Sequence, residues 1–187
     1  MSDLFNGKAK VVFLGLDFTQ AKYIGSSGFT DAGAIHNQHM VSWNNLIEFE
    51  PNKFSLVKPL KLREDQYEAK VADMIKYNKK VNVADNITDE RYTLEEAQAR
   101  KSVANYSLAD KDGIGVVYIV ESLSKTAEKM TVWVTFIDLA TKKILLMEKV
   151  EGKAAGFGFR NYWAGAVYKI NQNIGSKYYK TWSMGVK

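Results

Sequence analysis

Apolar residues form a nearly continuous run from Lys10 to Phe18, KVVFLGLDF, near the start of the chain. A short run of this kind is typical of a strand that is buried on both faces. The period of two predicts one face with Val11, Phe13, Gly15 and Asp17 and an opposite face with Val12, Leu14, Leu16 and Phe18. The Gly25-Ser-Ser-Gly28 sequence that follows predicts a loop.

Apolar residues take up helical spacing after this loop. A helix is predicted over residues 31–49, because Thr30 or Asp31 can cap its start. Its apolar stripe consists of Met40, Trp43, Leu46 and Ile47. Residues 54–57 form a short apolar run that we interpret as a second strand.

Two more helices are predicted in the middle of the chain. The first spans residues 64–78, with an apolar face made of Tyr67, Val71, Met74 and Ile75. The second spans residues 94–106, where Thr93-Leu-Glu-Glu96 has the spacing of a capping box. No element is predicted for the polar residues 81–91 between them.

The clearest pattern begins at residue 114. Strands are predicted at residues 114–123, 130–139 and 144–150, separated by polar turns. Three consecutive antiparallel strands, a meander, are the simplest arrangement for them. A last helix is predicted from about Asn161, and Gly175 is expected to end it.

This order of elements predicts one α/β (α+β) domain over residues 1–187. We expect a mixed sheet of about five strands that includes the C-terminal antiparallel meander, packed by about four helices. A hydrophobic content of 46% and a charged content of 25% suit a globular domain and exclude a disordered chain.

The formal net charge is +5, which raises the question of nucleic-acid binding. The lysines are spread along the whole chain with acidic residues between them, so we interpret them as a solvated surface and expect no nucleic-acid partner. The sequence contains no cysteine, which excludes disulfides, thiol catalysis and thiolate metal sites.

The apolar runs are all shorter than the ~20 residues that a transmembrane helix needs, so we expect no transmembrane segment. The compartment stays open. It is the bacterial periplasm or envelope if a signal segment was removed, and the cytoplasm otherwise.

Few polar residues could carry chemistry. His36 and His39 have the spacing of a metal pair, but no third ligand accompanies them, so we expect no metal site. Asp17 at the end of the first strand, and Lys22 beyond it, could face a ligand crevice. The structural alternative is that Asp17 hydrogen-bonds the loop that follows it. Because no second group completes an acid–base pair, we predict no catalytic residue and no cofactor.

Residues 156–163, Gly-Phe-Gly-Phe-Arg-Asn-Tyr-Trp, form the most unusual segment. Glycines that alternate with aromatic residues are typical of a contact surface for a protein or for stacked rings. The candidate binding residues are Phe157, Phe159, Arg160, Tyr162 and Trp163. The structural alternative is that Phe157, Phe159 and Trp163 fill the core.

The C-terminal part also resembles a known family. Val116-Val-Tyr-Ile-Val-Glu121 precedes a hairpin centred on Phe136-Ile-Asp-Leu-Ala-Thr-Lys-Lys143, and Ile144-Leu-Leu, a glycine-rich stretch and an amphipathic helix follow it. Over roughly residues 113–174, this order resembles the small α/β module of bacterial envelope proteins such as CsgG and the N-terminal domain of TolB. Lys142 stands where that turn usually has glycine. The resemblance implies the architecture and a non-enzymatic role in the envelope or in assembly.

We therefore expect a non-enzymatic bacterial protein that acts through contacts with a protein partner or with itself. One alternative is a small-ligand-binding domain that uses residues 17–28 or 156–163. The other is an enzyme that uses Asp17 or His36.

Overall fold

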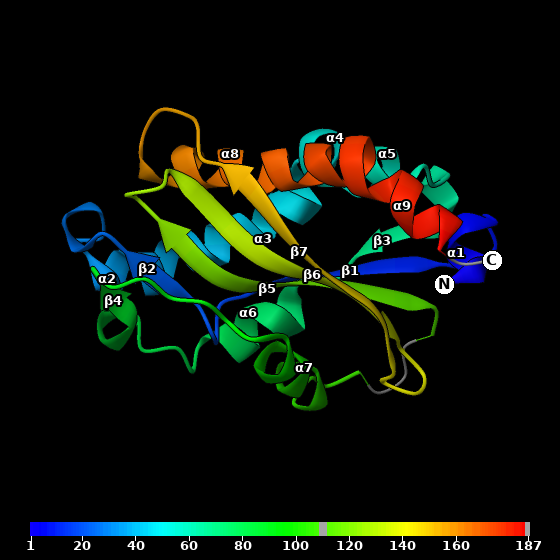
Figure 1. Ribbon diagram of the computed structural model, residues 1–187, viewed down its shortest axis with the longest axis horizontal. Helices are drawn as coiled ribbons and strands as arrows, with labels where there is room; N and C mark the ends of the chain where they lie inside the picture. Colours follow the sequence, from blue (N-terminus) through cyan, green and yellow to red (C-terminus); the bar gives the residue numbers. More distant parts are fainter. Residues whose placement is uncertain (109–111, 186–187) are drawn as a thin grey trace.

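The computed structural model describes residues 1–108 and 112–185. Within them, seven strands form one mixed sheet with helices on both of its faces (Figure 1). The strands are β1 (Val11–Asp17), β2 (Lys22–Ile24), β3 (Tyr67–Ala69), β4 (Ile87–Thr88), β5 (Ile114–Ser124), β6 (Lys129–Asp138) and β7 (Ile144–Lys153). The α/β fold class is confirmed, and β5, β6 and β7 form the predicted antiparallel meander.

The strands β1 and β2 lie end to end along the same edge of β5. β1 pairs in parallel with residues 114–119 of β5, and β2 pairs in parallel with residues 122–124. The opposite edge of β5 pairs with β6. Because β3 pairs with β1 and β4 pairs with β2, the order across the sheet is β3 and β4, then β1 and β2, then β5, β6 and β7.

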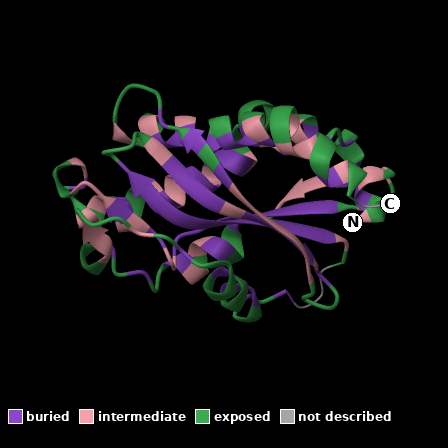
Figure 2. Ribbon diagram, in the orientation of Figure 1, coloured by how far each residue is buried: buried purple, intermediate pink, exposed green. Residues whose placement is uncertain are grey.

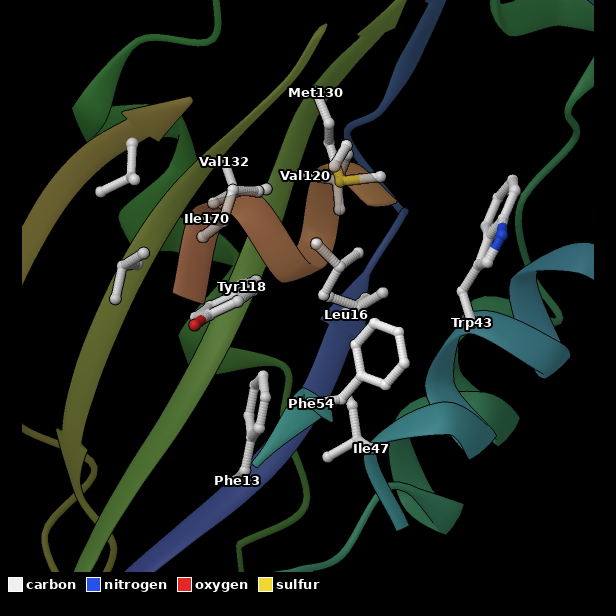
Figure 3. Packing of buried hydrophobic residues seen from close by; sticks show 14 of the residues in the cluster. Phe13, Leu16, Trp43, Ile47, Phe54, Tyr118, Val120, Met130, Val132 and Ile170 are labelled. Carbon is white, nitrogen blue, oxygen red and sulfur yellow. The ribbon is translucent and has the colours of Figure 1, made fainter. Parts of the chain in front are cut away.

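Helices form one layer on each face of this sheet (Figure 1). The helical segments are α1 (Ser2–Phe5), η1 (Ser26–Gly28), α2 (Ala32–Ala34), η2 (Ile35–His39), α3 (Met40–Phe49), α4 (Pro51–Phe54), α5 (Val57–Leu60), η3 (Glu64–Gln66), α6 (Ala72–Asn78), η4 (Ala84–Asn86), α7 (Glu96–Ala104), α8 (Phe159–Asn173), η5 (Ile174–Tyr178) and α9 (Tyr179–Met184). The larger core lies between the sheet and the layer of α3 and α8, where Trp43, Ile47 and Ile170 pack against the strands (Figure 3). The smaller core, with Met74 and Val103, lies beneath α6 and α7. In the part of the chain that is described, none of the helices has the length and apolar character of a membrane span.

A bulge at Gly15 changes which face the later side chains of β1 occupy. The register with β5 shifts between Phe13 and Gly15, and Gly15 has a φ of +107°. As a result, Leu16 and Phe18 join Phe13 in the larger core, whereas Asp17 contacts the α7 side of the sheet. The prediction of strict alternation is therefore wrong from Leu16 onward, because a bulge adds one residue to the repeat.

Two buried asparagines replace a missing strand beside β1. β3 pairs only with residues 11–13, so the outer edge of β1 beyond them needs other partners. Asn44 of α3 accepts a hydrogen bond from the Leu16 N–H at 2.8 Å and donates one to the Leu16 carbonyl at 3.2 Å. Asn78 of α6 accepts a hydrogen bond from the Phe18 N–H at 2.9 Å and donates one to the Leu16 carbonyl at 2.8 Å. These side chains allow the strand to end inside the protein.

The helix predicted over residues 31–49 is confirmed as α2, η2 and α3 in sequence. Asp31 caps it, since its Oδ1 accepts a hydrogen bond from the Ala34 N–H at 2.8 Å. Two other predictions are wrong. Residues 54–57 run from the last residue of α4 to the first residue of α5 and form no strand, because a short apolar run suits a buried helix as well as a strand. Residues 67–69 of the helix predicted over 64–78 instead pair with β1 as β3, and the helix α6 begins only at Ala72.

Some helix ends also differ from the predictions. α7 begins at Glu96 without a side-chain cap, so the capping box at Thr93 is wrong. The last helix begins at Phe159, close to the predicted residue, but it does not end at Gly175 and continues through η5 into α9. A Cβ atom on Gly175 would lie 3.2 Å from the Pro59 Cα atom, so this glycine serves the close packing of η5 on α5.

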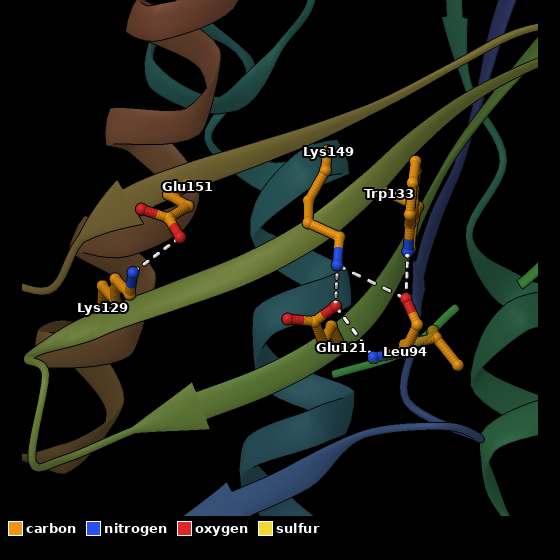
Figure 4. A network of polar contacts seen from close by, with 6 residues as sticks. All are labelled: Leu94, Glu121, Lys129, Trp133, Lys149 and Glu151. Carbon is orange, nitrogen blue, oxygen red and sulfur yellow. Dashed lines mark hydrogen bonds and ion pairs between the residues drawn. The ribbon is translucent and has the colours of Figure 1, made fainter. Parts of the chain in front are cut away.

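A polar network holds the segment before α7 against the sheet (Figure 4). The Leu94 N–H donates a hydrogen bond to Glu121 Oε2 at 3.0 Å. The Leu94 carbonyl accepts hydrogen bonds from Trp133 Nε1 at 3.1 Å and Lys149 Nζ at 3.4 Å. Lys149 also forms an ion pair with Glu121 at 2.5 Å. Side chains from three neighbouring strands thus bind both backbone groups of one buried residue.

We expect Gly15→Ala to lower the free energy of unfolding by about 2–4 kcal/mol, because positive φ is unfavourable for alanine and its Cβ would collide with Asn44 Oδ1. Urea unfolding measures this as a lower midpoint. Gly33→Ala is the control, since Gly33 is exposed and lacks a positive φ, and it should change the stability by less than about 1 kcal/mol. Equal midpoints for the two variants would contradict the role of the bulge.

Glu121→Ala should lower the free energy of unfolding by about 2–4 kcal/mol, since it leaves the Leu94 N–H and the Lys149 ammonium without this partner. The Lys129–Glu151 ion pair provides the comparison, because its side chains are 38% and 52% exposed. Lys129→Ala should therefore change the stability by about 0–1 kcal/mol. Chemical denaturation of both variants tests this, and a smaller loss for Glu121→Ala than for Lys129→Ala would refute it.

Candidate functional site

Asp17 is completely buried where the chain leaves β1. Its Oδ1 accepts hydrogen bonds from the N–H and the hydroxyl of Thr19, at 2.8 and 2.6 Å, and its Oδ2 accepts one from the hydroxyl of Tyr106. These contacts fit the structural interpretation, in which Asp17 binds the loop that follows. Burial raises the pKa of the Asp17 carboxyl above its usual range, and the hydrogen bonds from Thr19 and Tyr106 oppose part of that rise.

Tyr106 connects Asp17 to a hollow of about 300 Å³ between α6 and the end of α7. Leu14 and Met74 contribute to its apolar wall, and Asp17 is not part of its lining. The exposed lysines that line it are Lys70, Lys76 and Lys80. Burial raises the pKa of the Tyr106 phenol well above its usual value and the charge of Asp17 adds to this, so the phenol remains a hydrogen-bond donor at neutral pH.

Phe159 and Trp163, at the start of α8, belong to an aromatic cluster on the other side of the sheet. The centroid of the half-buried Phe159 ring lies 4.8 Å from that of His39 and 6.0 Å from those of Trp43 and Phe29. Trp163 is buried and stacks on Phe29 with 5.5 Å between the ring centroids. These two rings therefore help to fill the larger core, as the structural alternative predicts.

Phe157 behaves differently, because its side chain is 97% exposed. Filling of the core is therefore wrong for this residue. Nearby, Tyr162 is half-buried, with Lys125 Nζ 4.1 Å from its ring centroid and its hydroxyl 3.3 Å from Glu128 Oε1. Arg160 is exposed and donates hydrogen bonds to Ser42 Oγ at 2.5 Å and to Asn161 Oδ1 at 3.1 Å.

Lys22 lies apart from both groups. Its ammonium donates a hydrogen bond to Asn86 Oδ1 at 2.7 Å, which ties β2 to the segment before β4. Lys22 therefore links two short strands, and this contact explains its position.

The sheet separates the predicted site residues into two groups. Asp17 contacts Tyr106 on the α7 side, whereas Phe159 and Trp163 pack on the α3 and α8 side. His39 belongs to the second group, and burial lowers the pKa of its imidazole, with the nearby charge of Arg160 adding to the effect and that of Asp31 opposing it. Among residues 1–108 and 112–185, no cluster of three potential metal ligands occurs.

Sequence reasoning missed the partners of the aromatic segment. The sequence predicted Trp43 as part of the apolar stripe of its own helix, but nothing in the spacing of Trp43 or Phe29 indicated that α8 would pack on them. Ser42 was equally hidden, because its contact with Arg160 joins residues 118 positions apart in the chain.

The raised pKa of Asp17 predicts a pH dependence of stability. A carboxyl whose pKa is higher in the folded than in the unfolded state contributes most when it is protonated, so its contribution falls as the pH rises above about 4 through the raised pKa. Asp17→Asn removes this titration. The free energy of unfolding of the wild type minus that of Asp17→Asn should therefore decrease as the pH rises, measured by urea unfolding across a pH series. A difference that increases with pH would overturn the assignment.

Comparisons with known proteins add little to this geometry. No protein-family model matches the chain, and no curated protein matches it. Among solved structures, the chain is similar to the lipoprotein GNA1162 from Neisseria meningitidis, with 12% sequence identity over 81% of this chain and 84% of that chain. The TM-score is 0.34, and we base no conclusion about fold or function on this similarity.

Proposed function

We propose that this protein is a non-enzymatic bacterial protein that acts through protein–protein contacts, with Phe157 as the anchor of its contact surface. The single observation that carries the proposal is the 97% exposure of this ring. Burying a phenylalanine side chain in a partner contributes about 1.5–3 kcal/mol. Because isolated exposed apolar residues are common, the ordered loop that holds this ring is needed as further support.

The loop that carries Phe157 is held in shape by backbone geometry. Gly156 and Gly158, on either side of it, have φ values of +136° and +78°. The Ala155 N–H donates a hydrogen bond to the Tyr162 carbonyl at 3.1 Å, and the Tyr162 N–H donates one to the Gly158 carbonyl at 2.9 Å. A loop that is already ordered loses less conformational entropy when a partner binds, which leaves more of the burial energy for affinity.

Charged side chains lie around Tyr162, whose backbone is hydrogen-bonded to Ala155 and Gly158 on either side of Phe157. Lys125 covers the Tyr162 ring, and the Tyr162 hydroxyl reaches Glu128. An apolar anchor with polar groups around it is the usual composition of a contact surface between proteins. A role in catalysis receives less support, because the sheet keeps Asp17 away from His39 and Arg160.

For the location we propose the bacterial envelope. The support is the resemblance of residues 113–174 to the CsgG-like and TolB N-terminal-like module. The order of strand, hairpin, glycine-containing loop and helix that this resemblance implies is present as β5, β6, β7 and α8.

A photo-crosslinking amino acid at position 157, in the cells that make this protein, tests the proposal. We expect a discrete adduct of higher mass, recovered with the envelope fraction. The matched control is position 49, because Phe49 is also an exposed phenylalanine, at 75%. The same adducts from both positions, or none from position 157, would contradict a contact at Phe157. A discrete adduct in the cytosolic fraction would retain the contact and exclude the envelope.

A further inference from the structure

The hollow between α6 and the end of α7 has apolar walls. It is lined by Leu14 of β1, Met74 of α6 and Leu108 after α7, three buried side chains that border a space of about 300 Å³. The strand β1 is buried along its whole length, whereas α6 and α7 each carry exposed residues (Figure 2). A space of this volume with apolar walls lies at the lower end of the range of small-ligand sites.

Two tyrosines complete the wall. The rings of Tyr77 and Tyr106 meet edge to face, with 5.5 Å between their centroids and an angle of 89° between their planes. The Tyr106 hydroxyl donates its hydrogen bond to Asp17, and Asp17 itself does not line the hollow. An anion in the hollow is therefore separated from this buried carboxyl group by the Tyr106 ring.

The charged residues that line the hollow are mostly lysines. They are the exposed Lys70, Lys76 and Lys80, against one carboxylate, that of Asp73. Lys70 forms an ion pair with Glu68 at 3.0 Å. In the described part of the chain, neither Lys76 nor Lys80 forms an ion pair. Lysines are favourable at the end of any helix, so it is their position beside an apolar space that indicates a ligand.

We propose that the hollow binds a small organic anion with an apolar chain, the chemistry of a medium-chain fatty acid. The chain lies against the aliphatic wall, and the carboxylate lies beside Lys76 and Lys80. A neutral chain gains only the apolar contact, and an inorganic anion gains only exposed ion pairs, which contribute little. A ligand with both parts uses both features. The loop with Phe157 leads into α8 on the other face of the sheet, so the two proposals stand independently.

Titration with octanoate, followed by NMR of ¹³C-labelled methionine methyl groups, tests the site. Of the six methionines, Met74 lines the hollow, and its signal is assigned with Met74→Leu. We expect this signal to shift until it saturates. The neutral 1-octanol has a chain of the same length and should bind at least about threefold more weakly. A Met74 signal that does not respond to octanoate, or octanol binding as tight as that of octanoate, would overturn the proposal.

Variants of the exposed lysines test where the carboxylate binds. The double variant Lys76→Gln, Lys80→Gln should weaken octanoate binding at least about threefold and change octanol binding by less than about twofold. Lys79→Gln is the matched control, because Lys79 is an exposed neighbour of Lys80 that lines a different hollow. It should change octanoate binding by less than about twofold. Equal losses of octanoate binding in the double variant and in Lys79→Gln would refute the assignment.

Discussion

The backbone of β1 has to be hydrogen-bonded on both edges, although β3 covers only the first part of its outer edge. Asn44 and Asn78 supply the remaining partners at Leu16 and Phe18. These two side chains come from α3 and α6, which lie on opposite faces of the sheet, so the requirement fixes both helices relative to one strand. Gly15 makes the arrangement possible, because a side chain there would occupy the space of the Asn44 amide.

The elements that the sequence predicts correctly are those whose signal is local. The strands β5, β6 and β7 alternate or remain apolar over long stretches, and Asp31 caps its own helix. The strands β2, β3 and β4 have two or three residues each and exist because they pair with β1, β5 or each other. Their own side chains carry too little periodicity to distinguish them from loops or helix ends.

The candidate site follows the same division. The contact between Asp17 and the loop after it joins residues two positions apart, and turn chemistry was sufficient to predict it. The distribution of the aromatic residues of the 156–163 segment between core and surface depends on distant residues. The Phe159 ring packs against Phe29 and His39, whereas the Phe157 ring is exposed. The spacing of these residues in the sequence does not indicate this difference.

β7 and α8 are packed so closely that they form one mechanical unit. Gly152 approaches the Ala166 carbonyl and Gly165 approaches the Ala155 carbonyl, at distances that leave no room for a Cβ atom. The loop with Phe157 joins the end of β7 to the start of α8, so both of its ends are attached to this pair of elements. A larger residue at Gly152 or Gly165 would push the helix away from the strand, and the loop between them would have to change shape with it. The two glycines therefore limit the positions that the Phe157 ring can take, although neither of them is adjacent to it in the chain sequence.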